Sequence, residues 1–169
     1  MDYTFGAISR GSALATIEHR AGMYLLASVH GDLATIAIET IKSSFARLAR
    51  CGEAAALELV GAAPPVIAVS AAVALIDGDR AYIACARGGA VIRQRHGGNE
   101  AVSGEVQLLR GDDLIVAGGP LVVADAMFSA PAGRSGSGFA NDTLDHELAA
   151  ALGRLAPAGA FAVSAVRVC

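Results

Sequence analysis

Short β-prone runs separated by glycine-containing turns fill most of this chain and limit the folds open to it. The clearest pair of runs extends from Ser70 to Ile76 and from Ala81 to Ala86, with Asp77-Gly78-Asp79 between them. An Asp-Gly turn supplies the positive backbone angles that a tight hairpin needs. The pattern therefore predicts an antiparallel sheet built largely from hairpins.

Further strands are predicted on both sides of this hairpin. Near the N-terminus, the turns Arg10-Gly11 and Arg20-Ala21-Gly22 divide three runs that are typical of an antiparallel meander. These runs are Tyr3 to Ser9, Ser12 to His19 and Gly22 to His30. After the turn at Gly88-Gly89, the predicted strands are Ala90 to Arg95, Glu105 to Leu109, Leu114 to Ala117 and Ala160 to Val168.

Helical spacing replaces the strand pattern in three places. After Asp32, which can cap a helix, the apolar residues Leu33, Ala37, Ile41, Phe45 and Leu48 form a stripe that Ile36 and Ile38 widen. A shorter helix is predicted from Glu53 to Val60, and a last one after Asn141 or Asp142. The segment 129–141 is rich in glycine and serine, which predicts a flexible surface loop.

Strands gathered before and after a few helices, rather than alternating with them, indicate an α+β domain. The chain has 169 residues, of which 54% are hydrophobic, so it can bury one substantial core and is too short for two ordinary domains. We predict a single domain over residues 1–169. Its architecture is expected to be a four-layer αββα sandwich, two antiparallel sheets flanked by helices.

Composition argues against several classes of function. The net charge is −3 and Lys42 is the single lysine, so no basic surface for nucleic acid is expected. The apolar stretch from Ala54 to Ile76 is interrupted by polar residues and prolines, which argues against a membrane span. Cys51, Cys85 and Cys169 have no spacing typical of disulfides or zinc, and Cys85 is predicted to fill the core. With no secretion signal at the N-terminus, the cytoplasm of a bacterium is the expected location.

Two stretches of the sequence resemble the protein phosphatase 2C (PP2C) family of metal-dependent Ser/Thr phosphatases. The stretch AAVALIDGDRAYIACARGGAVIRQRHGG is similar to the central hairpin of that family, and VQLLRGDDLIVAGGPLV is similar to the strand before its Thr-Asp-Gly motif. The C-terminal helix and strand also fit the family order. The resemblance implies a β-sandwich with helices outside it. A proteasome-like sandwich is the competing interpretation, but Met1-Asp2-Tyr3 offers no N-terminal nucleophile.

The resemblance also implies a site for two divalent cations, held by clustered carboxylates that activate water. In this chain the family's acidic motifs are largely replaced, and its phosphate-binding arginine falls on Leu14. The corresponding residues are Ile17-Glu18-His19, His30-Gly31, Ala86-Arg87-Gly88, Ala117-Gly118-Gly119 and Gly159-Ala160. Four lost carboxylates remove most of the charge that magnesium or manganese would need, so we expect no cofactor.

The preferred hypothesis is therefore a pseudophosphatase that binds a protein, such as a kinase or a phosphoprotein, or a second copy of itself. Its binding face would lie on the former active site, and Arg87 would hold a phosphate or an acidic side chain. The residues expected on this face are Glu18, His19, His30, Gly31, Arg87 and Gly118. Two alternatives stay open. One is a divergent phosphatase with zinc or another transition metal on Glu18, His19, His30 and Asp32, and the other is a structural or oligomerising subunit.

Overall fold

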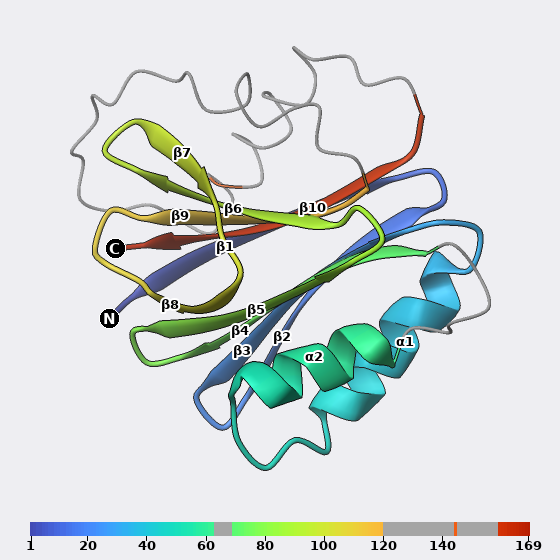
Figure 1. Cartoon of the computed structure of the whole chain (residues 1–169), viewed down its shortest axis with the longest axis horizontal. Helices are drawn as coiled ribbons and strands as arrows, with labels where there is room; N and C mark the ends of the chain where they lie inside the picture. The colour runs from blue at the N-terminus through green and yellow to red at the C-terminus, as the bar shows by residue number, and fades with distance from the viewer. Residues whose placement is uncertain (63–68, 120–143, 145–158) are drawn as a thin grey trace.

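The computed structural model describes residues 1–62, 69–119, 144 and 159–169, which form two five-stranded antiparallel sheets (Figure 1). Sheet 1 has the strand order β1-β10-β9-β6-β7, and sheet 2 has the order β2-β3-β4-β5-β8. The strands of sheet 1 are β1 (Tyr3–Arg10), β10 (Phe161–Val168), β9 (Asp113–Gly118), β6 (Ala90–Arg95) and β7 (Gly98–Ala101). Those of sheet 2 are β2 (Ala13–Arg20), β3 (Met23–His30), β4 (Ser70–Asp77), β5 (Arg80–Ala86) and β8 (Gly104–Gln107).

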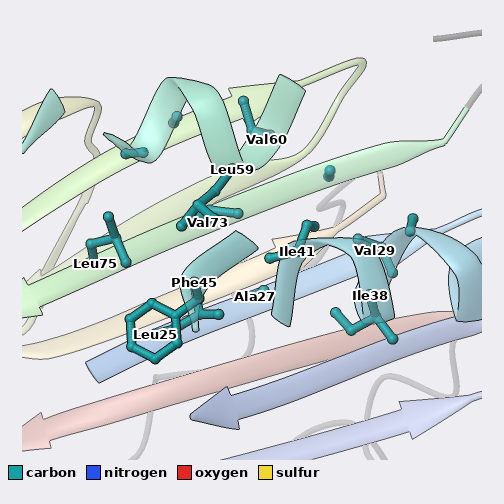
Figure 2. Close-up of a cluster of buried hydrophobic side chains, with 14 of the residues drawn as sticks. Leu25, Ala27, Val29, Ile38, Ile41, Phe45, Leu59, Val60, Val73 and Leu75 are labelled. Atoms are coloured by element: carbon teal, nitrogen blue, oxygen red, sulfur yellow. The ribbon is translucent and has the colours of Figure 1, made fainter. Parts of the chain in front are cut away.

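Sheet 2 lies between sheet 1 and two helices, α1 (Ala34–Phe45) and α2 (Glu53–Gly61) (Figure 1). One apolar cluster fills the space between the helices and sheet 2, where Phe45 of α1 lies near Leu25 of β3 and Ile41 lies nearer Ala27 (Figure 2). A second cluster, which includes Leu26 and Val116, fills the space between the two sheets. Because β3 and β4 are covered on both faces, their sequences are continuously apolar rather than alternating.

The predicted α+β sandwich of two antiparallel sheets is confirmed. The hairpin β4–β5 is present, with Asp77 paired to Arg80, so that Gly78-Asp79 rather than Asp77-Gly78 forms the centre of its turn. The helix predicted from Glu53 is α2. The predicted loop 129–141 and final helix lie outside the described residues, except for Leu144, whose exposed fraction is only 2%.

The predicted N-terminal meander is wrong in one respect, because β1 and β2 belong to different sheets. β2 and β3 form the expected hairpin, but β1 pairs along its whole length with β10, from Tyr3 opposite Val168 to Arg10 opposite Phe161. Gly11 carries the chain from one sheet to the other with a φ of +67°. A local turn signal cannot distinguish a hairpin from such a crossing, because the partner strand of β1 comes from the far end of the sequence.

Three local predictions also need correction. Asp32 does not cap α1, since the N-cap residue is Leu33 and no side chain bonds there. Ile36 does not widen the apolar stripe; its exposed fraction is 52%, whereas Ile38 is buried. Cys85 is exposed rather than part of the core, because β8 accompanies β5 only as far as Ile83 and leaves an open sheet edge beyond it.

Candidate functional site

The strand ends of both sheets converge at one end of the sandwich. In sheet 2, His30 at the end of β3 is paired with Ala13 at the start of β2 and with Ser70 at the start of β4. In sheet 1, Gly118 at the end of β9 is paired with Ala162 near the start of β10. The segments that meet here carry a concentration of glycines, and we call this part of the molecule the glycine end. Its glycines are Gly11, Gly31, Gly88, Gly89, Gly118 and Gly119.

His30 is the imidazole of the glycine end. It is half-buried, and a Cβ built on Gly119 would lie 3.4 Å from its Cγ atom, so the ring lies directly beside the main chain after β9. The next residue, Gly31, has a φ of +140° and its N–H donates a 3.0 Å hydrogen bond to the carbonyl of Ser12. This bond ties the loop before α1 to the loop before β2. His30 and Gly31, which the resemblance matched to the family's Asp-Gly pair, therefore lie together where β3 ends.

The turn between β5 and β6 contributes Arg87 to the same end. Arg87 is exposed and has a φ of +52°, in the left-handed region that non-glycine residues seldom adopt. The hydroxyl of Ser70 donates a hydrogen bond to the carbonyl of Arg87, and the N–H of Gly89 bonds to the carbonyl of Ala86 at 3.1 Å. Ser70 was not among the predicted site residues, yet it fixes the turn that presents the Arg87 side chain.

Glu18 and His19 lie at the opposite end of the sandwich, so their predicted place beside His30 is wrong. In the β2–β3 hairpin, Glu18 is opposite Leu25 and His19 is opposite Tyr24, whereas His30 is opposite Ala13. Six residues of strand separate Ala13 from His19, which corresponds to about 20 Å. A count back from the Ala21-Gly22 turn would have identified this register from the sequence alone.

At that opposite end, Glu18 and His19 have ordinary structural partners. Glu18 accepts a 2.9 Å hydrogen bond from the hydroxyl of Thr16 and lies 3.5 Å from the ammonium of Lys42. The ring of His19 stacks on that of Tyr24, with centroids 4.5 Å apart. Asp32, by contrast, is exposed next to Gly31 at the glycine end. The structure therefore does not assemble the four-residue metal set that the sequence suggested.

The residues at the glycine end do not fit the two divalent cations of the PP2C family. Nowhere in residues 1–62, 69–119, 144 and 159–169 do three His, Cys, Asp or Glu side chains come close enough together to hold a metal ion. Gly118, which the resemblance matched to a metal-binding aspartate, has no room for any side chain. A Cβ there would lie 2.7 Å from the main-chain N and carbonyl C of Val29.

Charged pairs gather instead at the other end, which we call the ion-pair end and define by Arg95, Asp112, Asp113 and Arg167. Arg95 binds the buried carboxylate of Asp112 through two 2.6 Å hydrogen bonds. Arg167 binds Asp113 in the same two-pronged geometry, at 2.8 and 2.9 Å. Burial alone would raise the pKa of Asp112, but hydrogen bonds from Arg95 and from the N–H of Leu109 outweigh it and lower that pKa.

Solved structures resemble the fold of this chain, although no family model or curated protein matches its sequence. A serine/threonine phosphatase of S. agalactiae has a TM-score of 0.71 at 10% identity, over 99% of this chain and all of that one. The SiaA-PP2C domain of Pseudomonas aeruginosa has a TM-score of 0.65 at 17% identity, covering 98% of this chain and 86% of that one. The chain has the PP2C fold.

A third solved structure with this PP2C fold, from work on the bacterial stressosome, has a TM-score of 0.67 at 13% identity and covers 99% of this chain and 100% of that one. Identities this low establish the fold and not the chemistry. Carboxylates must cluster to hold a metal ion, and Glu18 lies far from the glycine end, so the motif that the resemblance matched to Ile17-Glu18-His19 is misplaced. By register, the residue beside His30 on β2 is Ala13, which offers no ligand.

Proposed function

We propose that this PP2C-fold chain binds a protein partner through its glycine end and does not hydrolyse phosphoesters. The observation that carries the proposal is the chemistry of that end. Where the fold would need clustered carboxylates, the described residues place Ala13, Gly118 and Gly119 around a single imidazole, that of His30. Two hard dications prefer several anionic oxygen ligands, and the exposed Asp32 supplies at most one carboxylate here.

The comparisons support a regulatory role by analogy. One structure of the same fold comes from work that describes the bacterial stressosome as a modular system adapted to control secondary messenger signalling. Phosphatase folds thus occur in regulatory assemblies. For this chain we propose a kinase or a phosphoprotein as the partner and the cytoplasm of a bacterium as the setting. Of the helices in the described part of the chain, none is long and apolar enough to cross a membrane.

Arg87 is the residue of the glycine end best suited to an anionic partner. Arg87 is an exposed residue on a tight turn, and the hydrogen bond from Ser70 to its carbonyl orders the main chain there. Guanidinium groups bind carboxylate and phosphate with two parallel hydrogen bonds. We propose that Arg87 contacts a phosphorylated or acidic side chain of the partner.

The catalytic half of the proposal is tested by hydrolysis of a phosphothreonine peptide by the untagged protein. Manganese, magnesium and zinc would each be supplied at saturation, with an active PP2C phosphatase as the positive control and His30→Ala as the paired variant. We expect no turnover with any metal. Metal-dependent turnover that disappears in His30→Ala would instead establish the divergent phosphatase.

The binding half is tested by photo-crosslinking in the native host. The chain offers a matched pair of positions, because Arg87 and Ala21 are both exposed, left-handed residues followed by glycine, at opposite ends of the sandwich. We expect a photoreactive residue at position 87 to capture a discrete protein that the same residue at 21 does not. Equal capture at both positions would contradict the proposal, and capture of a second copy of this chain would favour an oligomerising subunit.

A further inference from the structure

At the glycine end the two sheets meet main chain to main chain. Gly118 of sheet 1 lies against β3 of sheet 2 so closely that a Cβ on it would be 2.7 Å from the carbonyl carbon of Ser28 and 2.7 Å from that of Val29. Real Cβ atoms do not approach backbone atoms at such distances, and backbone in the middle of a sheet cannot move aside cheaply. The φ of Gly118 is not in the left-handed region, so space alone requires glycine there.

A second contact of the same kind lies beside the first. A Cβ on Gly89, just before β6 of sheet 1, would lie 2.1 Å from the carbonyl oxygen of Ala71 on β4. Gly89 also has no left-handed φ. Val29 and Ala71 are paired on neighbouring strands of sheet 2, so Gly118 and Gly89 contact sheet 2 at adjacent positions.

Buried serines hold the sheets at this short spacing. The hydroxyl of Ser28 on β3 donates a 2.9 Å hydrogen bond to the carbonyl of Val116 on β9, and it lies 3.1 Å from the hydroxyl of Ser164 on β10. Both serines are fully buried, so these bonds between sheets satisfy groups that would otherwise be costly to bury. The bonds lie within two residues of Gly118 and reinforce its contact with β3.

We infer that the departure from phosphatase chemistry is fixed in the main chain, so that restoring the missing aspartates cannot restore a metal site. An aspartate at 118 collides with β3. A shift of one residue does not help, because Gly119 has a φ of +106° and its Cβ would lie against the His30 ring. This inference deepens the proposed loss of hydrolysis, on which it rests, by giving it a structural cause.

The first test is a matched pair of glycine substitutions on strands. Gly98→Ala is the control, since Gly98 begins β7, has no left-handed φ and meets only one ordinary contact at 3.5 Å. We expect Gly118→Ala to lower the melting temperature by about 4–10 °C more than Gly98→Ala does. Equal melting temperatures for the two variants would refute the inference that Gly118 leaves no room for a side chain.

The second test measures manganese binding by electron paramagnetic resonance. We compare His30→Asp, which changes only a half-buried strand end, with the double variant His30→Asp, Gly118→Asp. We expect no stoichiometric manganese in either, or failure of the double variant to fold while Gly98→Asp folds. Stoichiometric manganese bound by either folded variant would overturn the inference.

The proposed function and the main-chain inference can be refuted independently of each other. Turnover by the wild-type chain would refute the proposed function, whatever the Gly118 variants do. Manganese binding by an aspartate variant, with an inactive wild type, would refute the main-chain closure and leave the binding role intact.

Discussion

The two ends of this sandwich are stabilised by different kinds of contact. At the ion-pair end, charged side chains reach across loops and strands, as Arg95 does to Asp112 and Arg167 to Asp113. At the glycine end, Gly89 and Gly118 let the two main chains touch. The first kind of contact depends on pH and on side-chain chemistry, whereas the second depends only on volume.

This difference bears on the proposed function, because the resemblance to PP2C phosphatases implies metal chemistry at the glycine end, where Gly118 leaves no room for a side chain. Acidic residues are not scarce in the chain, and the two that arginines bind in two-pronged geometry, Asp112 and Asp113, lie at the ion-pair end. They lie about a strand length from His30, too far away to act as ligands at the glycine end. Under the proposed function, the carboxylates of Asp112 and Asp113 therefore serve stability rather than metal binding.

The largest effect on the ion-pair end is expected from Asp112→Ala. The carboxylate has an exposed side-chain fraction of 1%, and it accepts hydrogen bonds from Arg95 and from the N–H of Leu109. Its removal leaves the N–H of Leu109 without its carboxylate partner and separates the ion pair. We expect a loss of about 2–3 kcal/mol in the free energy of unfolding, measured with urea.

Glu105→Ala is the control for this measurement. Glu105 pairs with Arg80, but both side chains are largely exposed, and exposed ion pairs contribute little. We expect its unfolding curve to match that of the wild type within error. A comparable loss in the free energy of unfolding from both substitutions would mean that the contribution of these ion pairs does not depend on their burial.

A smaller effect is expected from acid. The pKa of Asp112 is lower in the folded protein than the value of about 4 for an unfolded aspartate. A lowered pKa contributes stability that is present above the unfolded value and is lost as the pH falls through the folded one. The free energy of unfolding of the wild type should therefore fall more steeply below about pH 4 than that of Asp112→Asn. Parallel pH profiles would assign the acid sensitivity to other groups.

Most of the fold was predictable, because its elements carry local signals. The helical stripe of α1 and the glycine turns at positions 22, 78 and 88 are each written within a few residues of sequence. The sheet that contains β1 was not predictable, since its partner β10 lies at the other end of the chain. Turn chemistry determines where a strand ends, but not which sheet the next strand joins.

The candidate site was predicted only in part, for a related reason. His30, Gly31, Arg87 and Gly118 do lie at one end, because each follows or ends a strand that the sequence identified. Glu18 and His19 were misplaced because their motif was matched by residue type and not by hairpin register. The closure at Gly118 could not be predicted at all, since it depends on the distance between two sheets.

The smallest predicted effect concerns turns found at both ends. Ala21 at the ion-pair end and Arg87 at the glycine end have φ values of +48° and +52°, and each is followed by a left-handed glycine. Such type I′ turns favour asparagine at the first position, because other residues are strained there. We expect Ala21→Asn and Arg87→Asn each to raise the free energy of unfolding by about 0.5–1 kcal/mol.

The control for the turn variants is Ala46→Asn, at an exposed alanine with an ordinary φ of −59°, where no gain is expected. A gain for Ala21→Asn but not for Arg87→Asn would sharpen the contrast between the two ends. It would mean that the Arg87 side chain contributes as much to the stability of the folded state as the strained turn costs. Equal increases in the free energy of unfolding at both turns would mean that arginine at position 87 does not improve stability. That result is expected if Arg87 is retained for binding.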